Sequence, residues 1–312
     1  MSRDALNSYL YYVFTSSCIP IGLLFFYIVI TKSPSALHVY RNTLLNLGFW
    51  YYAAVLKIGL FTQPIAVEHG SLFCIKSLGI ISFLSIPDHL HLFYVSGIVL
   101  CLNVLSGLWI CFFVRFAQLG CPLIASLVNS RKGFVSFAIW HLFASISFAV
   151  LSLKLFSYAR VIQIQDFHLL CFDLQLDSAI TIFLIIVSFF LVATGISILA
   201  FVVLILRILH QKRLFMSKKT FKLQRLLTIN IIVLAVLPII FDTIPIVSFS
   251  VVVYIRQSIP HDIYVVASHV PFFDVILSCT ATLAFVTPYR KSVSDMVSKF
   301  WRRGRVNQVS KM

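Results

Sequence analysis

Residues 179–206 are AITIFLIIVSFFLVATGISILAFVVLIL, a run in which no side chain is charged. A helix needs about 20 apolar residues to cross the hydrocarbon core of a bilayer, so this run is long enough to span a membrane. Basic residues follow it directly, beginning with Arg207, Lys212 and Arg213. A long apolar run followed by basic residues predicts a transmembrane helix whose C-terminal end faces the cytoplasm.

Six more apolar runs of about this length occur along the chain. The seven predicted helices are 9–30, 43–62, 89–114, 133–156, 179–206, 226–253 and 263–287. The stretch 72–86 is also apolar but short and interrupted; it is expected to extend the third span, to dip into the membrane or to cover the outer mouth. The first run is too long for the apolar part of a cleavable signal peptide and is expected to remain as a signal-anchor.

The composition agrees with a membrane protein. The 312 residues are 60% hydrophobic and 11% charged, and the mean hydropathy is +0.98. Soluble domains carry about 25% charged residues, so this chain lacks the polar surface that water requires. We expect one helical domain, 1–290, followed by a basic cytoplasmic tail, 291–312, with no large soluble domain.

The basic residues gather on one side of the predicted membrane. One alternating set of loops and the tail hold most of the 25 basic residues: Lys32, Arg41, Arg115, Arg131, Lys132, Arg207, Lys212, Arg213, Lys218, Lys219, Lys222, Arg225, Arg290, Lys291, Lys299, Arg302, Arg303, Arg305 and Lys311. The other segments hold most of the ten acids: Asp4, Glu68, Asp88, Asp166, Asp173, Asp177 and Asp262.

This asymmetry predicts an all-α membrane protein, a seven-transmembrane helix bundle with its N-terminus extracellular and its C-terminus cytoplasmic. Topology and the anionic lipids of the inner leaflet account for the net charge of +15, so membrane lipids are expected partners and nucleic acid is not. Transporters favour an even number of spans and internal repeats, and a seven-helix ligand-gated channel would have its N-terminus inside. Both remain alternatives to a receptor.

Asp242, Asp274 and Lys57 are charged residues that lie within the predicted spans. Each would cost a few kcal/mol facing lipid at mid-depth, so the acids should face the bundle interior. They are expected either to bind a ligand or to make a static hydrogen bond between helices. Lys57 lies near the outer end of its span, where its side chain is expected to reach the interface.

Polar residues at helical spacing indicate which faces point inward. Asp274, Ser278 and Thr282 recur every four residues, and Asn103 forms a similar stripe with Ser96 and Ser106. The candidate ligand-binding residues are therefore Asn103, Asp242, Asp274 and Ser278. Small polar residues on one face also serve as ordinary packing contacts between membrane helices.

Two prolines, Pro238 and Pro245, lie seven residues apart in the sixth span, so both bend nearly the same face of that helix. The bend is either a hinge or a static kink. The basic loop before it holds Lys218, Lys219, Lys222 and Arg225. With Arg115, these residues are expected to contact an acidic groove on a G protein, the inner leaflet or both.

Several segments carry a resemblance to a known family: residues 216–225 (MSKKTFKLQR), Leu237-Pro238, Ile244-Pro245, Tyr40-Arg41-Asn42, Leu45-Asn46 and Thr287-Pro288-Tyr289-Arg290. They are similar to nematode seven-transmembrane chemoreceptors of the Str superfamily, closest to serpentine receptor classes H and I. The chain differs in lacking an acid beside Arg115 and a Gly after His269.

The resemblance implies a chemosensory G-protein-coupled receptor in the plasma membrane of sensory neuron cilia. Its partners would be a small-molecule odorant or other chemical ligand and a heterotrimeric G protein. Cys74 and Cys171 are the only cysteines in the predicted outer loops, either as two free thiols or as a disulfide. The resemblance favours the disulfide, because serpentine receptors are usually restrained there.

Enzyme chemistry finds little support in the sequence. There is no HExxH, GxSxG or P-loop, and no cofactor is expected. Asp88, His89 and His91 lie close in sequence, but the two histidines do not share a helical face, so no metal site is expected.

Overall fold

The computed structural model describes residues 3–34, 37–69, 72–83, 90–164, 167–172, 178–255 and 261–309. In this part of the chain, seven helices are long and apolar enough to cross a membrane. They are α1 (Arg3–Thr31), α2 (His38–Leu56) with its π-helical extension (Lys57–Thr62), α3 (Leu90–Gly120), α5 (Arg131–Phe156), α6 (Ser178–Gln211), α7 (Lys218–Pro238) with a π-helical segment (Ile239–Thr243) and α8 (Ile244–Ile255), and α9 (His261–Phe285).

The seven predicted spans are therefore found, and most of the helices run a few residues past the predicted limits. Many residues of these extra turns are polar, as at the start of α5 and α7, and side chains cap both of these helices. Ser130 caps α5, where its Oγ accepts from the Gly133 amide at 3.4 Å. Ser217 caps α7 by accepting from the Thr220 amide at 3.2 Å.

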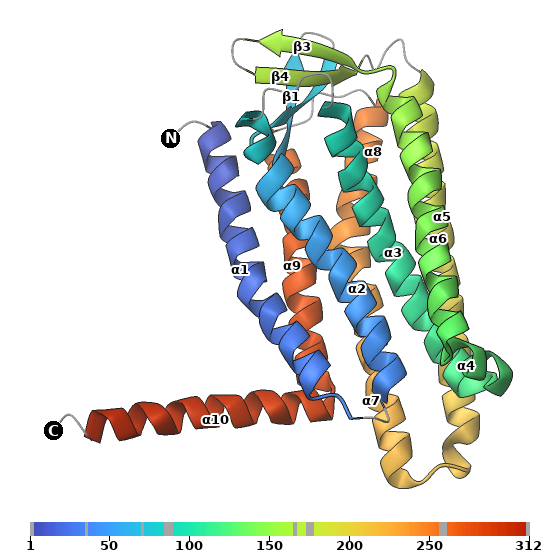
Figure 1. The fold of residues 1–312 in the computed structure, drawn as a ribbon. Helices are drawn as coiled ribbons and strands as arrows, with labels where there is room; N and C mark the ends of the chain where they lie inside the picture. The colour runs from blue at the N-terminus through green and yellow to red at the C-terminus, as the bar shows by residue number, and fades with distance from the viewer. Residues whose placement is uncertain are drawn as a thin grey trace.

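Helix α3 lies at the centre of the bundle. It packs against α2, α5, α6 and α7, whereas α1 packs against α2 and α9 (Figure 1). Helix α5 contacts the bundle mainly through α3 and shows many exposed apolar side chains, including Phe134, Phe143 and Val150. Such a surface fits lipid as its solvent.

A four-stranded antiparallel sheet covers one end of the bundle, which we call the sheet end (Figure 1). Its strands are β1 (Pro64–His69), β2 (Leu72–Ser77), β3 (Arg160–Ile164) and β4 (Phe167–Phe172), in the order β1-β2-β4-β3. This sheet was not expected from the sequence, which predicted helices alone. The described part of stretch 72–86 forms β2 and the short helix Ile80–Phe83, so it covers the bundle and adds no eighth span; its last residues lie outside the described part.

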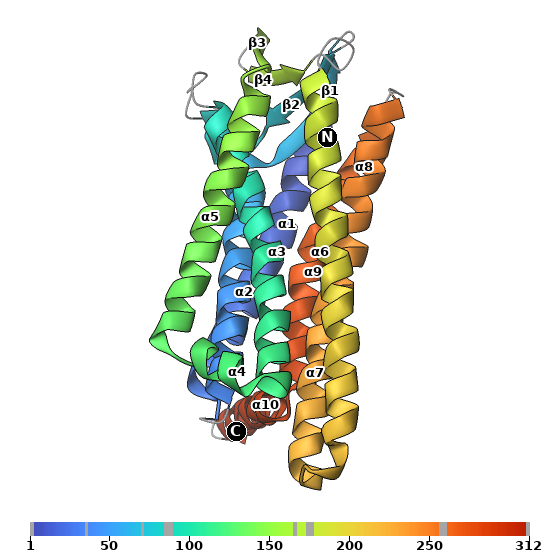
Figure 2. The same cartoon turned by 90° about the vertical axis from the view of Figure 1, so that its right-hand side faces the viewer.

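The opposite end is the α10 end. There the short helix α4 (Pro122–Val128) joins α3 to α5, and α10 (Thr287–Val309) runs across the bundle axis. Helix α10 begins before the predicted start of the tail at 291. Tyr289 anchors it: the side chain is buried, and its Oη lies 2.7 Å from Ser33 Oγ at the end of α1. Figure 2 shows the connection between α6 and α7 extending beyond α3 at this end.

Candidate functional site: buried acids, an arginine contact and a basic end

Asp274 is fully buried and has two hydrogen-bond donors. Tyr51 Oη of α2 donates to its Oδ2 at 2.7 Å, and Ser278 Oγ donates to its Oδ1 at 3.0 Å. The four-residue spacing that predicted Asp274 and Ser278 on one face thus places them in direct contact. Tyr51 is not among the candidates predicted from the sequence, although a phenol inside a predicted span is itself a signal, because its hydroxyl requires a partner there.

Asp242 lies on the π-helical segment between α7 and α8, close enough to Asp274 for their carboxyl groups to interact. Its Oδ1 is buried without a hydrogen-bond partner among the described residues. The only ion pair in the described part joins Lys76 to Asp4, far along the chain from either acid. The acid pair therefore needs a proton, a cation or a polar ligand to balance its charge.

Pro238 ends α7 and Pro245 is the second residue of α8, so the two prolines flank the π-helical segment. Each proline lacks the N–H that would bond to the carbonyl four residues earlier, which accounts for a local break in the helical ladder. Asp242 lies within this break. The hinge remains a prediction, now located at residues 239–243.

Thr282 continues the α9 stripe toward the α10 end. Asn230 Nδ2 of α7 donates to Thr282 Oγ1 at 3.3 Å and to Tyr40 Oη of α2 at 2.7 Å. All three side chains are buried. This cluster connects α2, α7 and α9, and Asn230 was not among the predicted residues.

Asn103 faces a different neighbour from the other candidates. Its Nδ2 donates to Ser145 Oγ of α5 at 2.8 Å, and its Oδ1 lies 2.7 Å from His141 Nδ1. An amide oxygen can only accept, so His141 Nδ1 carries the proton and its Nε2 accepts from Asn46 Nδ2 at 3.1 Å. The structure thus joins Asn103 to α5 and not to the acid cluster.

Arg115 is buried, with 3% of its surface exposed. Its Nη2 donates to the Gln224 carbonyl of α7 at 2.8 Å and lies 3.4 Å from Thr228 Oγ1. Arg115 therefore bridges α3 and α7 inside the α10 end, and its guanidinium is not on the surface in this conformation. A partner would reach it only after α3 and α7 separate.

The other predicted contact residues lie on the surface. Lys218, Lys219, Lys222 and Arg225 are all exposed on the first two turns of α7. Lys219, Lys222 and Arg225 follow one another at three-residue intervals and so share a helical face. The start of α7, where the stripe lies, belongs to the part of the bundle that extends beyond α3 at the α10 end (Figure 2).

The sheet end is held by covalent and ionic links. Cys74 of β2 and Cys171 of β4 lie opposite each other in the sheet and form a disulfide. Lys76 of β2 binds Asp4 of α1 at 2.7 Å. Lys57 Nζ lies 4.4 Å from the centroid of the Phe93 ring, a cation–π contact near that end of the bundle.

The described residues contain no group of three or more His, Cys, Asp and Glu side chains that could hold a metal ion. Asp88 and His89 lie outside the described residues.

The profile of one family, described as serpentine type 7TM GPCR chemoreceptor Srh, matches residues 2–299. The chain belongs to this family. Of the two receptor classes that the sequence resembles, the match selects class H. A comparison with curated proteins finds no match.

Membership in the Srh family has direct consequences. The chain is a multi-pass membrane protein of a chemoreceptor family, which is not a family of enzymes, and the match does not favour a channel or a transporter. Srh receptors as a class bind small chemical ligands and act through G proteins. The acid cluster, the Arg115 bridge and the basic stripe on α7 are therefore this receptor's own candidates for ligand and G-protein contacts.

Proposed function

We propose that this receptor binds a small odorant or other chemical ligand from outside the cell and activates a heterotrimeric G protein inside it. The sheet end is then extracellular and the α10 end cytoplasmic, as the distribution of basic residues favours. The proposed place of action is the plasma membrane of sensory neuron cilia. Nucleotide exchange takes place on the G protein, so the receptor needs no catalytic residue or cofactor of its own.

The observation that carries the proposal is the Arg115 bridge. A buried cation on α3 binds the backbone and a hydroxyl of α7, and α7 is the helix that carries the exposed basic stripe. Breaking that bridge frees the α10 end of α7 to move away from α3. The π-helical segment at 239–243 supplies a flexible joint at the other end of the same helix.

Ligand binding acts on that joint in the proposed mechanism. Asp242 is the first candidate contact, because its Oδ1 is buried and lacks a partner among the described residues. Asp274 and Ser278 are the next, since they form the other half of the acid cluster. A ligand that binds the cluster more tightly in one arrangement of α7 and α8 shifts the population toward that arrangement.

The test is a screen of a small-molecule library in cells that express the full-length receptor with a G-protein dissociation sensor. Once an agonist is found, Asp242→Asn should raise its half-maximal concentration about tenfold or more, which is about 1.4 kcal/mol. Asp295→Asn, on exposed α10, is the matched control and should change nothing. Reversing Lys219, Lys222 and Arg225 to Glu should abolish coupling, whereas reversing the exposed Lys291 and Lys299 should not.

Two outcomes would overturn the proposal. A receptor that reaches the cell surface but couples to none of the G-protein classes would remove the signalling half. An agonist-evoked ion current that persists without G proteins would instead support the seven-helix channel.

A further inference from the structure

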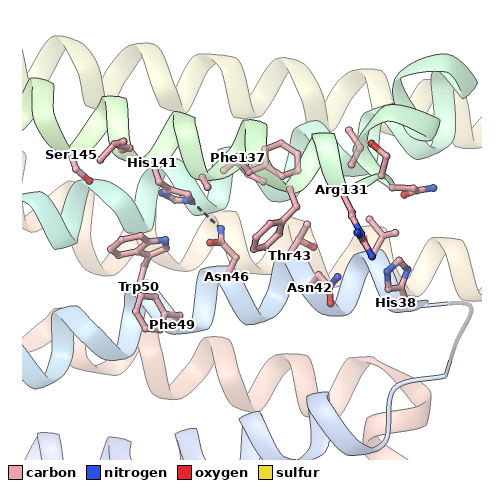
Figure 3. A pocket seen from close by; sticks show the side chains of 18 residues that line it. His38, Asn42, Thr43, Asn46, Phe49, Trp50, Arg131, Phe137, His141 and Ser145 are labelled. Atoms are coloured by element: carbon pink, nitrogen blue, oxygen red, sulfur yellow. Dashed lines mark hydrogen bonds between the residues drawn. The ribbon is translucent and has the colours of Figure 1, made fainter.

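A cleft of about 610 Å³ lies between α2 and α5, away from the acid cluster. Both helices pack on α3 and leave a gap between them, and Ile110 of α3 lies at the base of that gap. Figure 3 shows the side chains of α2 and α5 facing each other across it. The cleft is not used in the proposed ligand response.

The deep end of the cleft is closed by a chain of hydrogen-bonded side chains and by Trp50, whose buried Nε1 has no hydrogen-bond partner among the described residues. Asn46 of α2 and His141 of α5 join across it at 3.1 Å, and Asn103 and Ser145 complete the chain of hydrogen bonds. The ring of Trp50 packs on His141 with 5.0 Å between centroids. This end therefore forms a wall across the gap.

The apolar lining of the cleft faces outward. Phe134 of α5, one turn from Arg131, is 72% exposed, and Phe137 lines the cleft one turn further along. Phe49 of α2, beside Trp50 at the deep end, is 58% exposed. Benzyl side chains this exposed on membrane helices lie against hydrocarbon. The cleft is thus open to the lipid along its length.

The mouth of the cleft, at the α10 end, is polar and positively charged. Arg131 and His38 lie there on opposite sides, with Asn42 and Asn129 beside them (Figure 3). Arg131 is exposed and has no acidic partner among the described residues, where the only ion pair is Lys76 with Asp4. A bidentate guanidinium without a carboxylate is well suited to a phosphate group.

The dimensions of the cleft match one leaflet. Arg131 and His141 are ten residues apart on α5, which is about 15 Å along the helix. The hydrocarbon core is about 30 Å thick, so half of it covers the same depth. A single lipid therefore has the right length to place its polar group at Arg131 and the end of its acyl chain near the level of His141.

We propose that this cleft binds one anionic glycerophospholipid of the leaflet at the α10 end, with its phosphate on Arg131 and His38 and an acyl chain along Phe49 and Phe134. The lipid fills the gap that α2 and α5 leave over α3. It thereby holds α5, which otherwise contacts the bundle mainly through α3.

The experiment uses the full-length receptor in phosphatidylcholine nanodiscs that contain a trace of phosphatidic acid with a diazirine on its acyl chain. Illumination should label residues of α2 and α5 that line the cleft. Arg131→Gln should reduce this labelling at least fivefold, and Arg131→Lys should keep most of it. Ala138→Trp, which fills the apolar middle and leaves the mouth intact, should reduce it equally.

Arg290→Gln is the matched control, because Arg290 is an exposed arginine of α10 that does not line the cleft. An equal loss in this variant would mean that general surface charge attracts the lipid, and the site would be rejected. Unchanged labelling in Ala138→Trp would place the acyl chain elsewhere and reject it too. Sensitivity to Trp50→Phe without sensitivity to Arg131→Gln would instead assign the cleft to a small molecule that accepts from the indole N–H.

Discussion

Two carboxyl groups in one cluster have very different surroundings. Asp274 receives hydrogen bonds from Tyr51 and Ser278, whereas Asp242 Oδ1 has no partner among the described residues. Asp274 is therefore held in place by its neighbours. Asp242 is the carboxyl group whose Oδ1 can accept a hydrogen bond from a ligand. In the proposed mechanism, the carboxyl group of Asp274 is a fixed support and that of Asp242 accepts a hydrogen bond from the ligand.

Tyr51→Phe should destabilise the protein by about 1–3 kcal/mol, because it removes a donor from a buried carboxylate. Tyr27→Phe, at a half-exposed position of α1, should have almost no effect. Thermal unfolding in detergent checks this, with a maleimide dye that reacts as the buried thiols of Cys18, Cys111 and Cys279 become exposed. Equal midpoints for the two variants would show that the Tyr51 hydroxyl contributes little.

The sequence could predict which residues share a helical face but not which helix that face meets. Asp274 and Ser278 lie one turn apart, so their contact follows from helix geometry alone. Asn103 forms a stripe with Ser96 and Ser106 on its own helix, and that spacing does not say which helix the stripe faces. Its partners, His141 and Ser145, belong to α5, and only the packing of α3 between α2 and α5 decides that direction.

At the scale of elements, the long helices could be predicted and the sheet could not. A run such as 179–206 has one stable form in lipid, because every backbone group must bond within the segment. The strands are five or six residues long and include charged residues such as Lys76 and Arg160. Their pairing depends on segments far apart in sequence, such as β2 with β4, and no local pattern reveals it.

The sheet should depend on its disulfide. Cys74→Ser should lower stability by about 2–4 kcal/mol, since the bond closes a loop with a sequence separation of 97 residues. Cys171→Ser and the double variant should show the same loss. The thermal midpoint with and without reductant measures it, and Cys121→Ser, a free cysteine, is the control. If the double variant were much less stable than either single variant, loss of the Cys74–Cys171 disulfide would not explain the loss of stability.

The α3–α7 contact makes a prediction about signalling. Arg115→Ala removes a charged hydrogen bond worth about 1.5–3 kcal/mol, so basal G-protein coupling should rise about tenfold or more. Arg207→Gln, an exposed position on α6, is the control. The dissociation sensor reads basal coupling at matched surface expression. A fall in coupling would mean that Arg115 serves as a G-protein contact and not as a restraint.

At the scale of the whole molecule, orientation is the property to measure first. An epitope tag on the N-terminus should be accessible on intact cells, and a tag on the C-terminus should be accessible only after permeabilisation. The reason is the concentration of basic residues at the α10 end. Two hidden tags would mean an even number of spans, and a hidden N-terminus with an exposed C-terminus would favour the channel topology.

With the proposed hinge at 239–243, α7 acts as a lever. The helix from Lys218 to Pro238 has 21 residues, so its arm is about 31 Å long. A rotation of about 10° at 239–243 therefore displaces Lys218 by roughly 5 Å, on the order of one helical turn. Movements at the acid cluster too small to rearrange the packed core are thus magnified at the basic end, and the sensitivity of the receptor depends on how stiff those 21 residues remain.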